Sequence, residues 1–84
     1  MKTVTIYSTP SCHYCHMAKE FFNANNIQFT DYNVAEDSAK REEMVEMTGQ
    51  MGVPVIVVEK DDDSELVLLG FDKDKMATEL GIEL

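Results

Sequence analysis

The sequence predicts a small α/β sandwich: a four-stranded mixed sheet with helices on both faces, in the order β-α-β-α-β-β-α. The main observation is the hydrophobic periodicity, which switches repeatedly between two residues and about 3.6 residues. The second is the length, because 84 residues fit one domain, which we expect to span residues 1–84. The third is the composition, since 44% hydrophobic and 27% charged residues are typical of a globular chain.

The first three elements form a β-α-β unit. Residues 2–7 alternate between polar and apolar side chains and predict a strand, which a polar turn follows. Helical spacing begins at Cys12 and stops at residues 23–26, and residues 27–34 predict a second strand. A helix between two strands returns the chain to the same end of the sheet, so this unit should be a right-handed crossover with parallel strands. The helix should bury an apolar side made of Tyr14, Ala18, Phe21 and Phe22.

The second half predicts a further helix, a hairpin and a last helix. Ser38 can cap the further helix, which should end near Gly49. Residues 53–58 and 65–69 are aliphatic runs on either side of a polar turn, so they predict an antiparallel hairpin. Asp72 can cap the last helix. The buried sides should be Met44, Val45, Thr48 and Met51 in the first of these helices and Met76, Ala77 and Leu80 in the second.

The charge excludes some classes of partner. A net charge of −9 argues against nucleic acid, which is bound by clustered Lys and Arg. Nearly all the acidic residues lie after residue 30, and we interpret them as a solvated surface rather than an acidic docking site. No apolar run approaches the ~20 residues of a membrane span, and residues 1–7 lack the pattern of a signal peptide. We therefore expect a cytoplasmic monomer that binds no membrane.

The two cysteines, Cys12 and Cys15, form a C-x-x-C pair. In a reducing compartment this spacing is typical of a redox-active or metal-binding pair rather than a structural disulfide. Cys12 should lie at the start of the first helix, where unpaired amide groups and the macrodipole favour the nucleophilic thiolate. Cys15 lies one turn further in and should be more buried. We expect it to resolve the mixed disulfide formed on Cys12 by closing the Cys12–Cys15 disulfide.

Two of the three other residues around the pair, His13 and Tyr14, have two interpretations each. His13 lies between the cysteines and either stabilises the thiolate, making the disulfide more oxidising, or is an exposed bystander. Tyr14 either shields Cys12 or lines a substrate groove, or it only packs. His16 is expected to be a solvated surface residue.

The motifs, in this order, resemble those of the glutaredoxin family, which has the thioredoxin fold. Residues 4–15 resemble the strand and C-P-Y-C active site of that family, and residues 51–54 resemble its T-V-P segment. Residues 69–72 resemble its G-G-x-D turn, and residues 39–44 resemble the second helix of bacterial members. The resemblance implies a thiol–disulfide oxidoreductase that reduces disulfides of proteins or small molecules. It also implies no bound cofactor, with glutathione or a reductase as the external electron donor.

The resemblance also assigns residue roles. Cys12 would attack and Cys15 would resolve. Pro54 would follow a cis peptide bond, and Val53 would offer its backbone groups to the substrate. Phe71 and Asp72 match positions that hold the γ-glutamyl end of glutathione in the family; Asp72 can serve as a helix cap at the same time.

Three departures leave the electron donor open. His13 replaces the proline of the motif, Thr9-Pro10-Ser11 lacks the usual basic residue, and Leu69 replaces the first glycine of the turn. Gly70-Phe71 resembles NrdH-type redoxins, which take electrons from thioredoxin reductase. A glutathione-independent redoxin fed by thioredoxin reductase is therefore the alternative.

Rival classes share part of the motif. Residues 12–16 fit C-x-x-C-H, the attachment signature of c-type haem, but the strong strands argue against a small cytochrome. A zinc site needs four ligands in a tetrahedron, and two Cys and two His within five consecutive residues cannot wrap one ion, so we expect no metal. An iron–sulfur cluster shared by two chains through Cys12, as some glutaredoxins form, is a further alternative.

Overall fold

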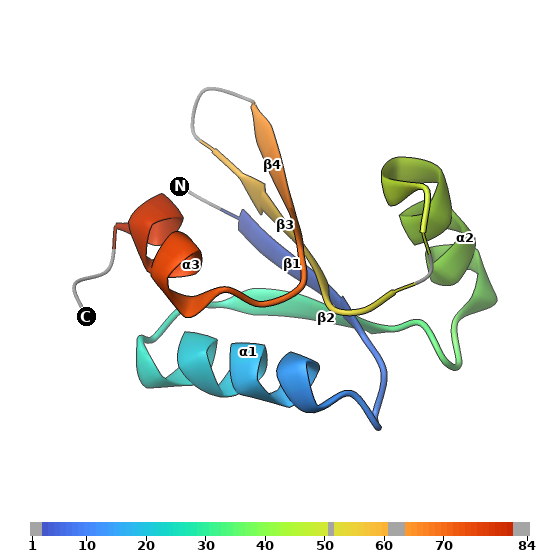
Figure 1. Ribbon diagram of the computed structural model, residues 1–84, viewed down its shortest axis with the longest axis horizontal. Helices are drawn as coiled ribbons and strands as arrows, with labels where there is room; N and C mark the ends of the chain where they lie inside the picture. Colours follow the sequence, from blue (N-terminus) through green and yellow to red (C-terminus); the bar gives the residue numbers. More distant parts are fainter. Residues whose placement is uncertain (1–2, 51, 61–63, 82–84) are drawn as a thin grey trace.

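The computed structural model describes residues 3–50, 52–60 and 64–81. Within these residues, four strands and three helices follow one another in the predicted order (Figure 1). They are β1 (Thr3–Ser8), α1 (His13–Ala24), β2 (Phe29–Asn33), α2 (Ser38–Thr48), β3 (Val55–Glu59), β4 (Glu65–Leu69) and α3 (Lys73–Leu80). The predicted α/β fold is confirmed.

The four strands form one sheet in the order β2-β1-β3-β4. The β1–β2 pair is parallel, whereas β1–β3 and β3–β4 are antiparallel, as the crossover and the hairpin predict. Tyr7 pairs with Val55, and Val55 pairs with Leu69. The segments that follow β1, precede β3 and follow β4 therefore meet at one end of the sheet.

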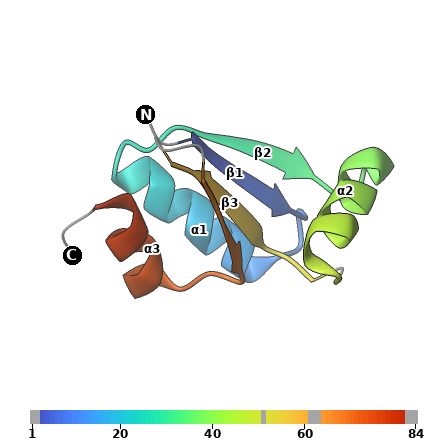
Figure 2. The same ribbon diagram turned by 90° about the horizontal axis from the view of Figure 1, so that it is seen from above.

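The sheet separates two apolar cores. Helices α1 and α3 cover one face, and α2 covers the other (Figures 1 and 2). Val4 and Ile6 pack in the α1–α3 core, whereas Tyr7 packs in the α2 core, so the predicted alternation of β1 is confirmed. Side chains on both faces of β1 and β3 are buried, which fixes the register of these strands against both layers.

Several boundaries differ from the predicted ones. The second strand begins at Phe29 rather than at residue 27, because Asn26 takes a left-handed conformation (φ 56°) and the Ile27 N–H still bonds back to the Phe22 carbonyl, at 2.8 Å. Strand β3 begins at Val55, two residues later than predicted. In α2 only Met44 is fully buried, while Val45 and Thr48 are half-buried. The expected burial of Met51 lies outside the described residues.

The cap of α2 is Asp37, not Ser38. The Asp37 carboxylate accepts the backbone N–H of Lys40 at 3.1 Å, and Ser38 is already the first helical residue. Aspartate and serine are both common caps. With the cap one residue earlier than predicted, the charged carboxylate of Asp37 lies at the positive end of the helix dipole. Asp72 caps α3 as predicted, accepting the Lys75 N–H at 3.2 Å.

Replacing Asp37 with alanine should lower the free energy of unfolding by about 1 kcal/mol, because the Lys40 N–H loses its acceptor. Ser38→Ala is the matched control and should change the same quantity by less than about 0.5 kcal/mol. Urea unfolding followed by circular dichroism measures both variants. A larger loss in Ser38→Ala would make Ser38 the cap after all.

No helix within the described ranges is both long and apolar enough to cross a membrane.

Candidate active site

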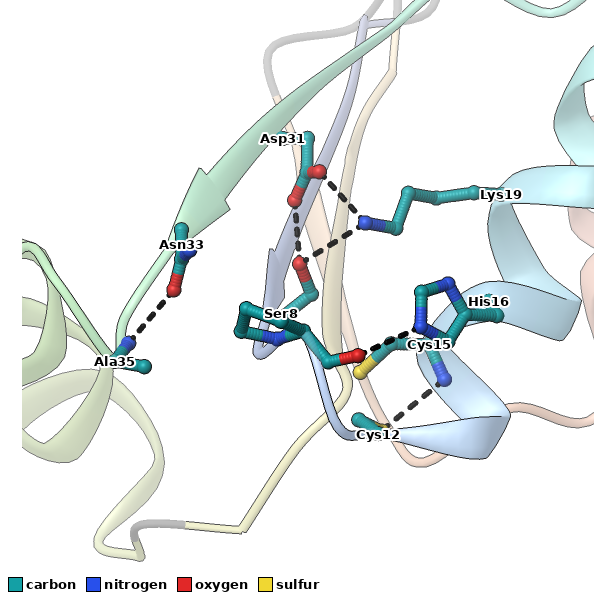
Figure 3. A network of polar contacts seen from close by, with 9 residues as sticks. Ser8, Cys12, Cys15, His16, Lys19, Asp31, Asn33 and Ala35 are labelled. Carbon is teal, nitrogen blue, oxygen red and sulfur yellow. Dashed lines mark hydrogen bonds and ion pairs between the residues drawn. The ribbon is translucent and has the colours of Figure 1, made fainter.

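Cys12 occupies the N-cap of α1. Its backbone is extended (φ −84°, ψ 111°), and its Sγ accepts the backbone N–H of Cys15 at 3.1 Å (Figure 3). The side chain is partly exposed. A thiolate at this place faces the free amide groups and the positive end of the helix dipole. The structure therefore places Cys12 where the sequence predicts it, with its sulfur both accessible and bonded to the helix terminus.

Cys15 lies in the opposite environment. It is fully buried beneath the first turn of α1. Burial, followed by the hydrogen bond with Cys12, raises the pKa of the Cys15 thiol to about 12. Both cysteines are free thiols in this structure. Cys12 is thus partly exposed at a helix terminus, whereas Cys15 is buried and protonated, an asymmetry that suits stepwise disulfide exchange.

The loop between β1 and α1 is tied to the helix by His16. This residue is exposed, as predicted, but its Nε2 lies 2.8 Å from the carbonyl oxygen of Pro10. A carbonyl only accepts, so Nε2 carries the proton. The N–H of Cys12 also donates to the Thr9 carbonyl at 3.2 Å. Together these bonds fix the loop that delivers Cys12 to the cap position, a role that no periodic pattern in the sequence reveals.

His13 and Tyr14 stand on the outer side of the first turn. Both are exposed, and their rings meet edge to face at 5.8 Å. Tyr14 is 60% exposed, so its predicted place on the apolar side of α1 is wrong. Cys15 takes that inward position, because it lies three residues before Ala18 and seven before Phe22.

The other candidate residues lie in the segments that meet at the same end of the sheet. The Val53–Pro54 peptide bond is cis, as the resemblance implies. Pro54 is fully buried, and its carbonyl accepts the Gly70 N–H at 2.8 Å. This bond ties the segment before β3 to the turn that carries Phe71 and Asp72. Phe71 packs on Phe21 of α1 with ring centroids 5.7 Å apart, and the Asp72 carboxylate is exposed at the start of α3.

A polar cluster next to α1 was not expected from the sequence. Lys19 extends from α1 and bonds to Asp31 of β2 at 2.8 Å and to the hydroxyl of Ser8 at 3.4 Å (Figure 3). Ser8 in turn donates to the other oxygen of Asp31 at 2.5 Å. The only signal in the sequence is a lysine one helical turn after Cys15, since the strand register that brings Ser8 near Asp31 is invisible there.

Within residues 3–50, 52–60 and 64–81, no group of three or more His, Cys, Asp and Glu side chains is arranged to hold a metal ion.

Comparison with known proteins gives a consistent result. The family model described as glutaredoxin matches residues 4–62. A glutaredoxin-like 8.6 kDa protein of the rubredoxin operon of Clostridium pasteurianum is 43% identical over 70 residues, which cover 83% of this chain and 87% of that protein. Glutaredoxin 3 of Escherichia coli K12 is 36% identical over 59 residues, covering 70% and 71% of the two chains.

Solved structures agree. The crystal structure of a mutant thioredoxin-like protein superposes on this chain with a TM-score of 0.81 and 30% sequence identity. The superposition covers 99% of this chain and 100% of the other. The NrdH-redoxin of Escherichia coli, a glutaredoxin-like protein described as having a thioredoxin-like activity profile, gives a TM-score of 0.73 at 25% identity, covering 90% and 92%. The glutaredoxin-type thioredoxin fold is therefore shown for this chain.

Proposed function

The chain belongs to the glutaredoxin family, and from its cysteine pair we propose that it is a dithiol thiol–disulfide oxidoreductase that reduces disulfides of proteins or small molecules. One observation carries this proposal: the Cys12 sulfur accepts a helix N-terminal N–H while Cys15 is buried directly behind it. The pair suits a reducing compartment, so we propose that the protein works in the cytoplasm, as one domain and a monomer, with no bound cofactor.

The proposed reaction has two exchange steps. The Cys12 thiolate attacks one sulfur of the substrate disulfide; that sulfur becomes bonded to Cys12, and the other leaves as a thiolate that takes up a proton. Cys15 then loses its proton and attacks the Cys12 sulfur, which forms the Cys12–Cys15 disulfide and releases the second substrate thiol. The protein has then given two electrons to the substrate, and an external donor must return them.

The substrate is proposed to bind across the segments that meet beside Cys12. Val53 would offer its backbone groups, with Pro54 fixing the segment, and the exposed Asp72 carboxylate would attract an ammonium group. Phe71 borders an apolar groove of about 420 Å³ that Met17 and Phe21 also line. The exposed ring of Tyr14 stands on the same turn as the cysteines and would cover a bound disulfide.

His13 is proposed to tune the pair. Its exposed ring lies at the first position of α1, next to Cys12. There it can donate a hydrogen bond to the Cys12 thiolate or place a positive charge beside it. His13→Pro should lower the reduction potential by roughly 30 mV, because the reduced form loses a stabilising group. Proline is tolerated at the first helical position, so the helix should be retained. Equilibration with a thiol–disulfide buffer measures the potential, and an unchanged value would make His13 a bystander.

Two electron donors are candidates. Glutathione is the donor that the family resemblance implies. Thioredoxin reductase is favoured by the loop before Cys12, which offers no basic side chain for a glutathione carboxylate. It is also favoured by Leu69, which replaces the first glycine of the family's pair, and by the resemblance of Gly70-Phe71 to NrdH-type redoxins.

The donor is tested with the oxidised protein. One assay supplies glutathione, glutathione reductase and NADPH, and the other supplies thioredoxin reductase and NADPH. Catalytic NADPH consumption in only one assay identifies the donor, with Cys12→Ser as the blank in both. Consumption in neither assay, from a protein that is intact and oxidised, would contradict both candidates.

A further inference from the structure

In the resolving step the buried Cys15 thiol must become a thiolate, and the cysteine pair itself supplies no positive charge that would favour this. Cys15 must lose a proton to attack, but it is fully buried, and burial of a thiol disfavours its charged form. The helix terminus that favours the Cys12 thiolate is already bonded to Cys12. A second source of positive potential beside Cys15 would therefore favour this step.

Lys19 is placed to be that source. It follows Cys15 by one helical turn, so both side chains emerge from the same side of α1. The Cys15 side chain contacts the backbone of Thr9, and the preceding residue, Ser8, is the hydroxyl partner of Lys19. Two causes lower the pKa of the Cys15 thiol: the hydrogen bond with the Thr9 backbone, which is the larger, and the Lys19 charge, which is the smaller but is the only positive charge among them.

Asp31 and Ser8 hold Lys19 in this place. The Lys19–Asp31 ion pair is half-buried, with side chains 24% and 34% exposed, so solvent screens it less than a surface pair. Ser8 is only 2% exposed and bonds to both members. Without these partners the flexible lysine side chain would extend into water and leave the cysteine.

The other charged groups near Cys15 cannot replace Lys19. Cys12 is bonded to the substrate sulfur in this step, so it carries no charge and only receives the attack. The His16 ring is turned to the Pro10 carbonyl, and His13 stands on the outer side of the helix. The only charged residue of β3, Glu59, pairs with Thr3 at the far end of the sheet. Lys19, with Asp31, is thus the charge that faces Cys15 among the described residues.

We propose that Lys19, anchored by Asp31 and Ser8, is a positioning residue that favours the Cys15 thiolate in the step that closes the Cys12–Cys15 disulfide. This inference rests on the proposed dithiol reaction. Lys19 takes no part in bond exchange: the Cys15 proton goes to solvent, the Cys15–Cys12 bond forms, and the second substrate thiolate leaves.

The test separates the two steps in one stopped-flow trace. DTNB is an aromatic disulfide that releases one yellow thiolate when Cys12 attacks and a second when Cys15 closes the disulfide. An excess of DTNB makes the first phase faster than the second. Lys19→Gln keeps a polar side chain for Asp31 and Ser8 but removes the charge, and should slow the second phase about five-fold with the first unchanged. Lys19→Arg keeps the positive charge, so its second phase should be as fast as that of the wild-type protein.

The pH profile distinguishes an electrostatic role from a structural one. The second-phase rate of Lys19→Gln should follow the wild-type curve displaced to higher pH by about 0.7 units, since this is the displacement that matches a five-fold change. A merely structural effect would lower the rate equally at every pH. Lys40→Gln is the matched control, because Lys40 also has a half-exposed acidic partner, Glu43, but lies on α2 against the other face of the sheet.

The second-phase rates and their pH dependence decide whether Lys19 acts through its charge. A second phase in Lys19→Gln equal to wild type, or slowed to the same extent at all pH values, overturns the inference while leaving the dithiol reaction intact. If Lys19→Gln does not fold, the Lys19→Arg and Asp31→Asn profiles decide in its place: an Asp31→Asn second phase equal to wild type overturns the anchoring of Lys19. Absence of the first phase in the wild-type protein would instead contradict the proposed function itself.

Discussion

Cys12→Ser should abolish disulfide reduction, whereas Cys15→Ser should retain the first exchange and stop there. Serine is not ionised at neutral pH and does not attack disulfides, and the buried Cys15 cannot replace Cys12 from beneath the helix. We expect the rate with Cys12→Ser to fall at least roughly a thousand-fold. In Cys15→Ser the mixed disulfide on Cys12 has no resolving thiol and accumulates.

The stoichiometry of thiolate release from DTNB checks both halves of this prediction. Reduced wild-type protein should release two equivalents, Cys15→Ser one, and Cys12→Ser none on the same time scale. Mass spectrometry of the Cys15→Ser product should find the substrate half attached to Cys12. Similar release from both variants would show that the two sulfurs are interchangeable, and the proposed division of roles would be wrong.

The reduced protein should lose stability steeply at alkaline pH because of Cys15. The pKa of this thiol is about 12 in the folded protein, against 9.0 for an unperturbed thiol, as in the unfolded chain. Between these values the unfolded chain has released the proton and the folded protein has not, so the free energy of unfolding falls as pH rises. The slope is about 1.4 kcal/mol per pH unit for one group, so roughly 2 kcal/mol is lost from pH 9 to 10.5.

Other groups contribute in the same range, and a control variant removes them. Burial and the neighbouring Glu43 also raise the pKa of Tyr7, which acts in the same direction. Cys15→Ala keeps Tyr7 and every lysine, so the difference between the two proteins isolates Cys15. Urea unfolding under a reducing agent at several pH values gives both curves. Parallel curves for wild type and Cys15→Ala above pH 9 would mean that the Cys15 thiol ionises as it does in an unfolded chain.

The fold could be predicted from local patterns of polar and apolar residues in the sequence. Alternation in residues 2–7 and the run of β-branched residues before Glu59 each indicate a strand, and the spacing after Cys12 indicates a helix. The helical crossover between the first two strands then makes that pair parallel. Asp37 shows the limit of this reasoning. Two neighbouring capping residues satisfy the same rule, and only the tertiary course of the chain decides which one bonds to the helix.

The sequence predicts those parts of the candidate site that depend on one local element. It does not predict those parts that depend on how separate segments pack together. The placement of Cys12 and the burial of Cys15 follow from one helix start and its periodicity. The bond from His16 to an irregular loop, and the cluster of Ser8, Lys19 and Asp31, require knowledge of which segments meet. The same holds for Tyr14, whose exposure depends on the rotation of α1 about its axis.

Alkylation of the reduced protein at neutral pH tests the central claim, that one sulfur is accessible at a helix terminus and the other is buried and protonated. A brief treatment with iodoacetamide, followed by peptide mass mapping, reports the modified fraction of Cys12 and Cys15 separately. The structure predicts that Cys12 is modified while Cys15 remains intact until the protein is unfolded. Equal modification of both cysteines, or modification of Cys15 first, would contradict the account.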